Sequence, residues 1–145
     1  MPISRHLCRE IVVQALFACE SRDMPLPTEL DATLTSVIAE FYPDMGEETA
    51  FCRHLVRGIA KTLPALQGAI SKQAPEWPIG KINAMDRAIL YVGTYEMLSE
   101  KDTPPAVIIN ECVELAKKYG ADNGPKFVNG VLNGLKNANR VPVTA

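Results

Sequence analysis

The sequence predicts an all-α protein, and three observations support that fold class. Apolar residues recur every three to four positions along most of the chain, which is the spacing of one helix face. No segment shows the alternation of apolar and polar residues that a half-buried strand would have. Proline, glycine and asparagine gather between the periodic segments, where helices begin and end. We therefore expect about seven helices in two packed helical bundles, forming one compact domain over residues 1–145.

The first half of the chain contains four of the expected helices. Ser4 is placed to cap the first helix, since its hydroxyl can accept from a backbone N–H one turn further on. Pro64 separates the third helix from the fourth, because proline has no N–H to give to the preceding turn. The four apolar stripes cover residues 7–16, 30–41, 51–63 and 65–73.

A rigid link in "APEWPIGKIN", which contains Pro75 and Pro78, separates two helical subdomains of roughly residues 1–74 and 81–140. Asn83 can cap the helix that follows, with Asp86 at the third helical position of a capping-box-like pair. That helix, "AMDRAILYVGTYEMLSE", is apolar on most sides, so we expect it to be the central one.

Two more helices complete the expected fold. The first has Pro104 at its first helical position and ends before Gly120. The second begins at residues 123–125 and contains "KFVNGVLNGL", in which Gly130 and Gly134 each cost ~1 kcal/mol relative to Ala. These glycines lie four apart on one face, so we expect them to let a neighbouring helix approach closely.

The composition is that of a folded globular protein and limits its partners. Apolar residues make up 47% of the chain and the formal net charge is −2, so no global positive field attracts nucleic acid. The N-terminus shows no secretory signal, and no stretch reaches the ~20 apolar residues of a membrane span. The four cysteines are scattered, which predicts buried thiols of a reduced, cytoplasmic protein.

The residues needed for catalysis or metal binding are missing from the sequence. His6 and His54 are the only histidines, and Cys52 lies two positions from His54, which places the pair on different helix faces. No phosphate-binding loop, dinucleotide-binding motif, zinc-protease motif or nucleophile elbow occurs. We therefore expect a protein that is not an enzyme and that uses no metal and no cofactor.

Cations beside aromatic residues point instead to binding of single-stranded RNA. Arg5 and Arg9 lie four apart at the start of the first helix, and we expect their shared face to be exposed. Lys126 and Phe127 lie at the start of the last helix. Such pairs suit RNA, because cations meet phosphates and bases stack on rings. Packing in the core is the alternative role for Phe127, whose position also fits the apolar stripe.

The segment "PPAVIINECVELAKKYGADNGPKFVNGVL" strongly resembles the C-terminal signature of the NusB family. "MDRAILYVGTYEML" resembles the central helix of that family, and "CREIVVQALFACE" resembles its first helix. The likeness spans nearly the whole chain and implies an all-α fold of two helical bundles. It also implies a role in transcription antitermination, in which the protein binds boxA-type RNA together with NusE, the small-subunit ribosomal protein. The two then join a complex of RNA polymerase and other Nus factors.

Family positions carried over to this sequence give the expected site residues. Family members often begin with a dense arginine cluster, whereas "MPISRHLCRE" has two arginines. Fewer cations release fewer counterions, so we expect RNA binding to depend more on NusE. The residues implied to contact RNA are Arg5, Arg9, Phe17, Lys126, Phe127 and Asn129, and those implied to contact NusE are Asp86 and Asn123.

Two other functions are compatible with these motifs. One is the RNA-binding accessory domain of an RNA methyltransferase, although the sequence ends at Ala145 without the cofactor-binding domain expected of such an enzyme. The other is a protein–protein adaptor with weak RNA binding, an alternative that the thinned arginine cluster leaves open.

Overall fold

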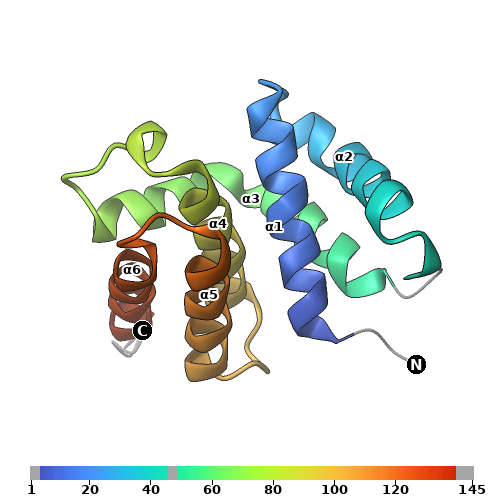
Figure 1. The fold of residues 1–145 in the computed structure, drawn as a ribbon. Coiled ribbons are helices and arrows are strands. Elements are labelled where there is room, and N and C mark those ends of the chain that lie inside the picture. Colours follow the sequence, from blue (N-terminus) through green and yellow to red (C-terminus); the bar gives the residue numbers. More distant parts are fainter. Residues whose placement is uncertain (1–3, 46–48, 140–145) are drawn as a thin grey trace. The chain divides into compact units, whose positions relative to one another are not determined.

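The computed structural model describes residues 4–45 and 49–139, and all regular structure within these ranges is helical (Figure 1). The all-α prediction is therefore confirmed. Short 3-10 turns at Pro43–Met45 and Ile79–Lys81 lie between the helices. The α-helices, in chain order, are α1 (Arg5–Ser21), α2 (Leu26–Phe41), α3 (Ala50–Gln73), α4 (Ala84–Ser99), α5 (Pro105–Tyr119) and α6 (Gly124–Asn139).

The chain divides into two compact units, Met1–Leu63 and Pro64–Ala145. The boundary lies inside α3, beside a kink where Thr62 leaves helical geometry (φ −114°, ψ 15°). Pro64 explains the kink, because its ring clashes with the preceding turn and it has no N–H to donate. The two helices expected at residues 51–63 and 65–73 are thus one kinked helix, and the proline-rich link at residues 75–80 lies within the second unit.

The first unit contains α1, α2 and the first part of α3. Ser4 caps α1 as predicted, with its hydroxyl oxygen accepting from the Leu7 N–H at 3.1 Å. α1 packs along α2, and the Tyr42 hydroxyl after α2 donates to the Gln14 side chain of α1 at 3.0 Å. α3 is attached through buried apolar side chains and by Cys52, whose Sγ lies 3.9 Å from the Cys8 carbonyl oxygen. The predicted burial of all four cysteines is confirmed.

The second unit is built around α4. Every residue from Ala88 to Glu96 is buried, and α4, α5 and α6 pack against one another pairwise, which confirms that α4 is central (Figure 1). The last part of α3 joins them through a hydrogen bond that the Gln67 side-chain amide donates to the Tyr91 hydroxyl at 3.2 Å. None of the helices in the described ranges combines the length and hydropathy that a bilayer span requires.

The two glycines of α6 behave differently. A Cβ on Gly130 would meet no atom within 4 Å, so the prediction of a close helix contact there is wrong. A Cβ on Gly134 would collide with the flexible end of the Gln73 side chain, so at this position the side chain of a neighbouring helix, α3, does come close. The close contact lies at Gly93 of α4, where a Cβ would sit 2.8 Å from Cys112 Sγ of α5 and 3.0 Å from Leu132 of α6.

Candidate functional site

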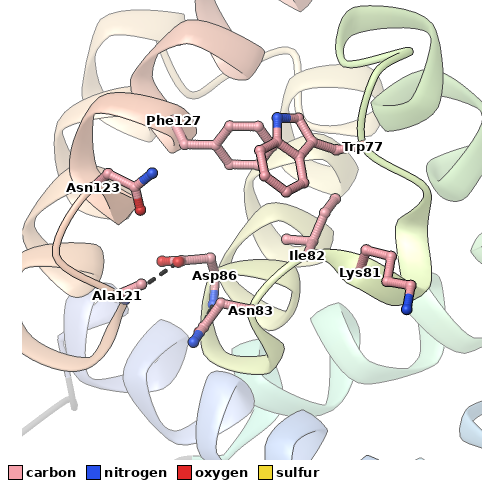
Figure 2. A pocket seen from close by; sticks show the side chains of 8 residues that line it. All are labelled: Trp77, Lys81, Ile82, Asn83, Asp86, Ala121, Asn123 and Phe127. Atoms are coloured by element: carbon pink, nitrogen blue, oxygen red, sulfur yellow. Dashed lines mark hydrogen bonds between the residues drawn. The ribbon is translucent and has the colours of Figure 1, made fainter.

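A pocket of about 90 Å³ lies in the second unit, where the α3–α4 linker, the start of α4 and the α5–α6 loop meet (Figure 2). Trp77 and Phe127 each contribute a ring to its lining, and Figure 2 draws the carboxylate of Asp86 below these rings. Half of the Trp77 side chain is exposed. The residues that line the pocket are Trp77, Lys81, Ile82, Asn83, Asp86, Ala121, Asn123 and Phe127.

Asp86 is the unusual group of this pocket because it is a carboxylate that is only 3% exposed. Its Oδ2 accepts from the Ala121 N–H at 3.3 Å, while its Oδ1 is buried without a hydrogen-bond partner among the described residues. Burial raises the pKa of Asp86, and the Ala121 N–H opposes that effect in part. A buried oxygen without a donor is costly, so this atom favours a ligand that brings an N–H or a cation.

The expected capping box at the start of α4 is not formed. Asn83 caps the helix, with its side-chain oxygen accepting from the N–H groups of Met85 at 3.0 Å and Asp86 at 3.3 Å. Asp86 does not complete the pair, because the α5–α6 loop covers this end of α4 and supplies the Ala121 N–H in its place. The carboxylate therefore holds the loop and not its own helix end.

Two glycines let the α5–α6 loop close around the carboxylate. A Cβ on either Gly120 or Gly124 would collide with the side chain of Asp86. Gly120 has a φ of −81°, which any residue adopts, so its need for glycine comes from the close approach of Asp86 and of the Ala116 carbonyl oxygen, 2.8 Å from the Cβ position. The sequence predicted Gly120 only as a helix end, and α5 does end at Tyr119 before it.

The predicted residues of the second unit fall into two sets. Asp86, Asn123 and Phe127 line the same pocket, and Lys126 is exposed next to Phe127. Asn129 is not part of that pocket, since it lies about 200° further around α6 than Phe127. Its backbone and side-chain oxygens both accept from the Asn133 amide at 2.9 Å.

The predicted cations of the first unit are organised by a ring that the sequence reading did not include. The guanidinium carbon of Arg5 lies 4.6 Å from the centroid of Phe51, and that of Arg9 lies 5.6 Å away. Arg5 is exposed, but Arg9 is only 3% exposed, so the expectation that both project from an open face is wrong for Arg9. The long arginine stem explains this, because it packs as an apolar group while the guanidinium lies over a ring.

Phe17 lies apart from these cations. It is twelve residues from Arg5 along α1, a distance of roughly 18 Å. Its side chain is 40% exposed and borders a groove of the first unit together with Ala18, Val37 and Phe41. Phe41 is itself 64% exposed, so the structure places Phe17 in a groove with a second exposed ring and not beside Arg5.

Sequence reasoning missed Trp77 and Phe51, and a signal existed for one of them. Trp77 is the only tryptophan and stands between Pro75 and Pro78 in a linker, where no apolar stripe explains a large ring. Phe51 fits the stripe of α3 and gave no such signal. Among the described residues no group of three or more His, Cys, Asp or Glu side chains converges as metal ligands.

Comparison with known proteins identifies the family. The sequence model of the NusB family matches residues 6–137. The transcription antitermination protein NusB of Roseiflexus castenholzii is 41% identical over 130 residues, which cover 88% of each chain. A solved structure of T. maritima NusB is 34% identical and superposes with a TM-score of 0.84 over 94% of this chain and 93% of that one. A chain from "Crystal Structure of a Plectonemic RNA Supercoil" also has a TM-score of 0.84, at 22% identity over 95% of this chain and 97% of that one, and shows the shared fold.

The described residues form an all-helical protein with a pocket lined by rings, amides and a buried carboxylate. The chain belongs to the NusB family. Its function is accordingly that of a transcription antitermination factor.

Proposed function

We propose that this protein is a non-catalytic antitermination factor that acts in the cytoplasm, where it binds boxA-type single-stranded RNA together with NusE. The two then join RNA polymerase and other Nus factors. The pocket beside Phe127 carries this proposal, because it combines two aromatic rings with a buried carboxylate oxygen that has no partner among the described residues. A chain of the same fold occurs in a solved structure whose name mentions RNA, and this is consistent with the proposal.

The proposed RNA contacts are divided between the units. In the second unit, the Phe127 ring would stack on a base while Lys126 meets a phosphate. In the first unit, Arg5 would meet a phosphate, with Arg9 behind it holding Phe51 in place. Phe17 and Asn129 complete the proposed set, Phe17 as a half-exposed ring and Asn129 through its side-chain N–H groups.

The proposed NusE contacts are Asp86 and Asn123, which both line the pocket. The free oxygen of Asp86 would accept from a cationic or N–H-bearing side chain of NusE, where a charge-assisted bond in a buried site is strong. Asn123 is exposed and can donate or accept at the rim.

Titration of labelled boxA-type RNA, with and without NusE, tests this function. We expect the parent protein to bind the RNA and NusE to tighten that binding. Phe127→Ala should cost ~1–3 kcal/mol of RNA binding with little change in salt dependence, because a lost stack releases no counterion. Lys126→Ala should lower the slope of log affinity against log salt by about 0.7, as expected for one phosphate on a single strand.

Thermal unfolding of each variant is the control, because Phe127 is partly buried. If Phe127→Ala loses RNA binding only in proportion to lost folded protein, the ring packs and does not stack. If the parent binds no RNA in the presence of NusE, the proposed function is wrong and the adaptor alternative takes its place.

A further inference from the structure

The exposed face of the first part of α3 carries cations that no contact within the described residues neutralises. Arg57 and Lys61 are both exposed, and neither has an ion-pair partner among the described residues. His54 is exposed on the same face. The three positions lie within about 60° of one another around the helix and span roughly 10 Å of its axis. We call His54, Arg57 and Lys61 the α3 strip.

The Phe51 ring connects the α3 strip to the cations at the start of α1. The His54 ring stacks beside Phe51, with 6.4 Å between the centroids. Phe51 in turn lies under the guanidinium of Arg5 at 4.6 Å. A row of cationic and titratable groups therefore runs from the start of α1, across Phe51 and along α3, all within the first unit.

One acidic residue, Asp31 of α2, pairs with α3 to one side of the strip. Asp31 of α2 pairs with Arg53 at 3.4 Å, and Arg53 also donates to the Thr35 hydroxyl at 3.1 Å. Arg53 is thereby tied to α2, on the flank of α3 away from Phe51. Asp31 therefore leaves Arg57 and Lys61 available for an external anion.

The chemistry of the α3 strip favours a polyanion over a protein partner. Protein interfaces are anchored by buried apolar or aromatic side chains. The exposed large hydrophobic residues of the described chain lie elsewhere, and Phe51 is covered by two guanidinium groups. A row of cations without an apolar anchor suits a phosphate backbone, which binds by charge and without sequence preference.

We propose that the α3 strip is a sequence-independent phosphate track, on which Arg57 and Lys61 hold nucleotides flanking the boxA-type segment. This inference rests on the proposed function and adds a second class of contact to it. Arg5 and Lys126 serve the boxA-type segment itself, whereas the track binds whatever sequence continues from it.

The test compares the parent with Arg57→Ala/Lys61→Ala in the presence of NusE, using boxA-type RNA alone and with a short oligouridine flank at either end. In the parent, one of the two flanks should tighten binding. The double variant should lose that gain, bind the flanked RNA roughly 2- to 30-fold more weakly at low salt, and show a salt slope smaller by about 1.4. Arg57→Lys/Lys61→Arg should behave as the parent, since charge and not shape is read.

Lys101→Ala is the matched control, because Lys101 is an exposed cation in the α4–α5 turn of the other unit. Its slope should equal that of the parent. The track is overturned if the parent binds RNA but the double variant keeps both the slope and the gain from the flank. It is also overturned if the double variant loses affinity for NusE and not for RNA. If the parent binds no RNA at all, the proposed function is overturned together with the track. That outcome is distinct from the other two, in which the parent still binds RNA.

Discussion

At the scale of one residue, Asp86 is a carboxylate whose burial opposes stability. Its pKa in the folded protein is raised by burial, above the unfolded value of about 3.9. A raised folded pKa means that the contribution of this group to stability is complete below the unfolded pKa and is lost as pH rises through the folded pKa. At pH values above the folded pKa, the buried charge of this carboxylate therefore opposes folding.

The variant Asp86→Asn tests this directly. The amide oxygen can still accept from the Ala121 N–H, while the buried charge is gone. Denaturant unfolding should find the variant at least as stable as the parent at pH 7, with any advantage shrinking toward pH 4. NusE affinity at low salt should fall in the same variant. The prediction is contradicted if Asp86→Asn is less stable than the parent at pH 7 and this deficit shrinks at pH 4. In that case the negative charge of Asp86 stabilises the loop.

Gly120 provides a second prediction at the same scale. Gly120→Ala should lower the free energy of unfolding by about 1–3 kcal/mol, because the new Cβ meets the Asp86 carboxylate. Urea titration of the single variants and of Gly120→Ala/Asp86→Ala measures the coupling between the two positions. Part of the loss should vanish in the double variant, where the colliding carboxylate is absent, and the rest should remain, because the new Cβ also lies 2.8 Å from the Ala116 carbonyl oxygen. Equal losses with and without Asp86 would place the cause in the loop backbone.

At the scale of the helix, Gly130 of α6 and Gly93 of α4 differ in the space at their Cβ positions. Gly130 sits in an exposed part of α6 with open space at its Cβ position, so Gly130→Ala should stabilise the protein by ~1 kcal/mol. Gly93→Ala in α4 should destabilise it by about 1–3 kcal/mol, because Cys112 and Leu132 are already in contact range. Guanidinium unfolding of both variants checks the pair. A stabilised Gly93→Ala would show that α4 has room to move.

The helices themselves could be predicted because their signals are local. Ser4, Asn83 and the apolar period mark where helices start and which faces are buried, and the structure follows them. The kinked continuity of α3 could not be predicted in the same way. A proline ends or bends a helix according to the packing on both sides, which a single stretch of sequence does not contain.

The candidate site was predicted less completely, for a physical reason. Asp86 and Phe127 lie 41 positions apart in the sequence. The helical spacing of apolar residues is local, so it cannot predict that these two residues share a pocket with Trp77. The α3 strip could not be predicted from the net charge of a segment. When charges are summed along the sequence, the acidic residues of α2 offset the basic residues of α3. In the fold, an ion pair between these helices joins Asp31 to Arg53, which is not part of the strip.

For the whole molecule, the net charge of −2 predicts a modest response to salt. The exposed cations assigned to RNA are Arg5, Arg57, Lys61 and Lys126. At about 0.7 per phosphate, the full log–log slope for flanked RNA should be no steeper than about −3. Binding measured over a series of KCl concentrations with NusE present checks this value. A slope twice as steep would require cations beyond those four.

The position of Trp77 gives the protein a built-in optical probe. It is the only tryptophan in the chain, it is half exposed, and it lines the Asp86 pocket. Indole emission changes in colour and intensity when its surroundings become drier or when another ring stacks on it. Fluorescence of the unlabelled protein therefore reports on the surroundings of this pocket without any added dye. A ligand that enters the pocket will shift the emission.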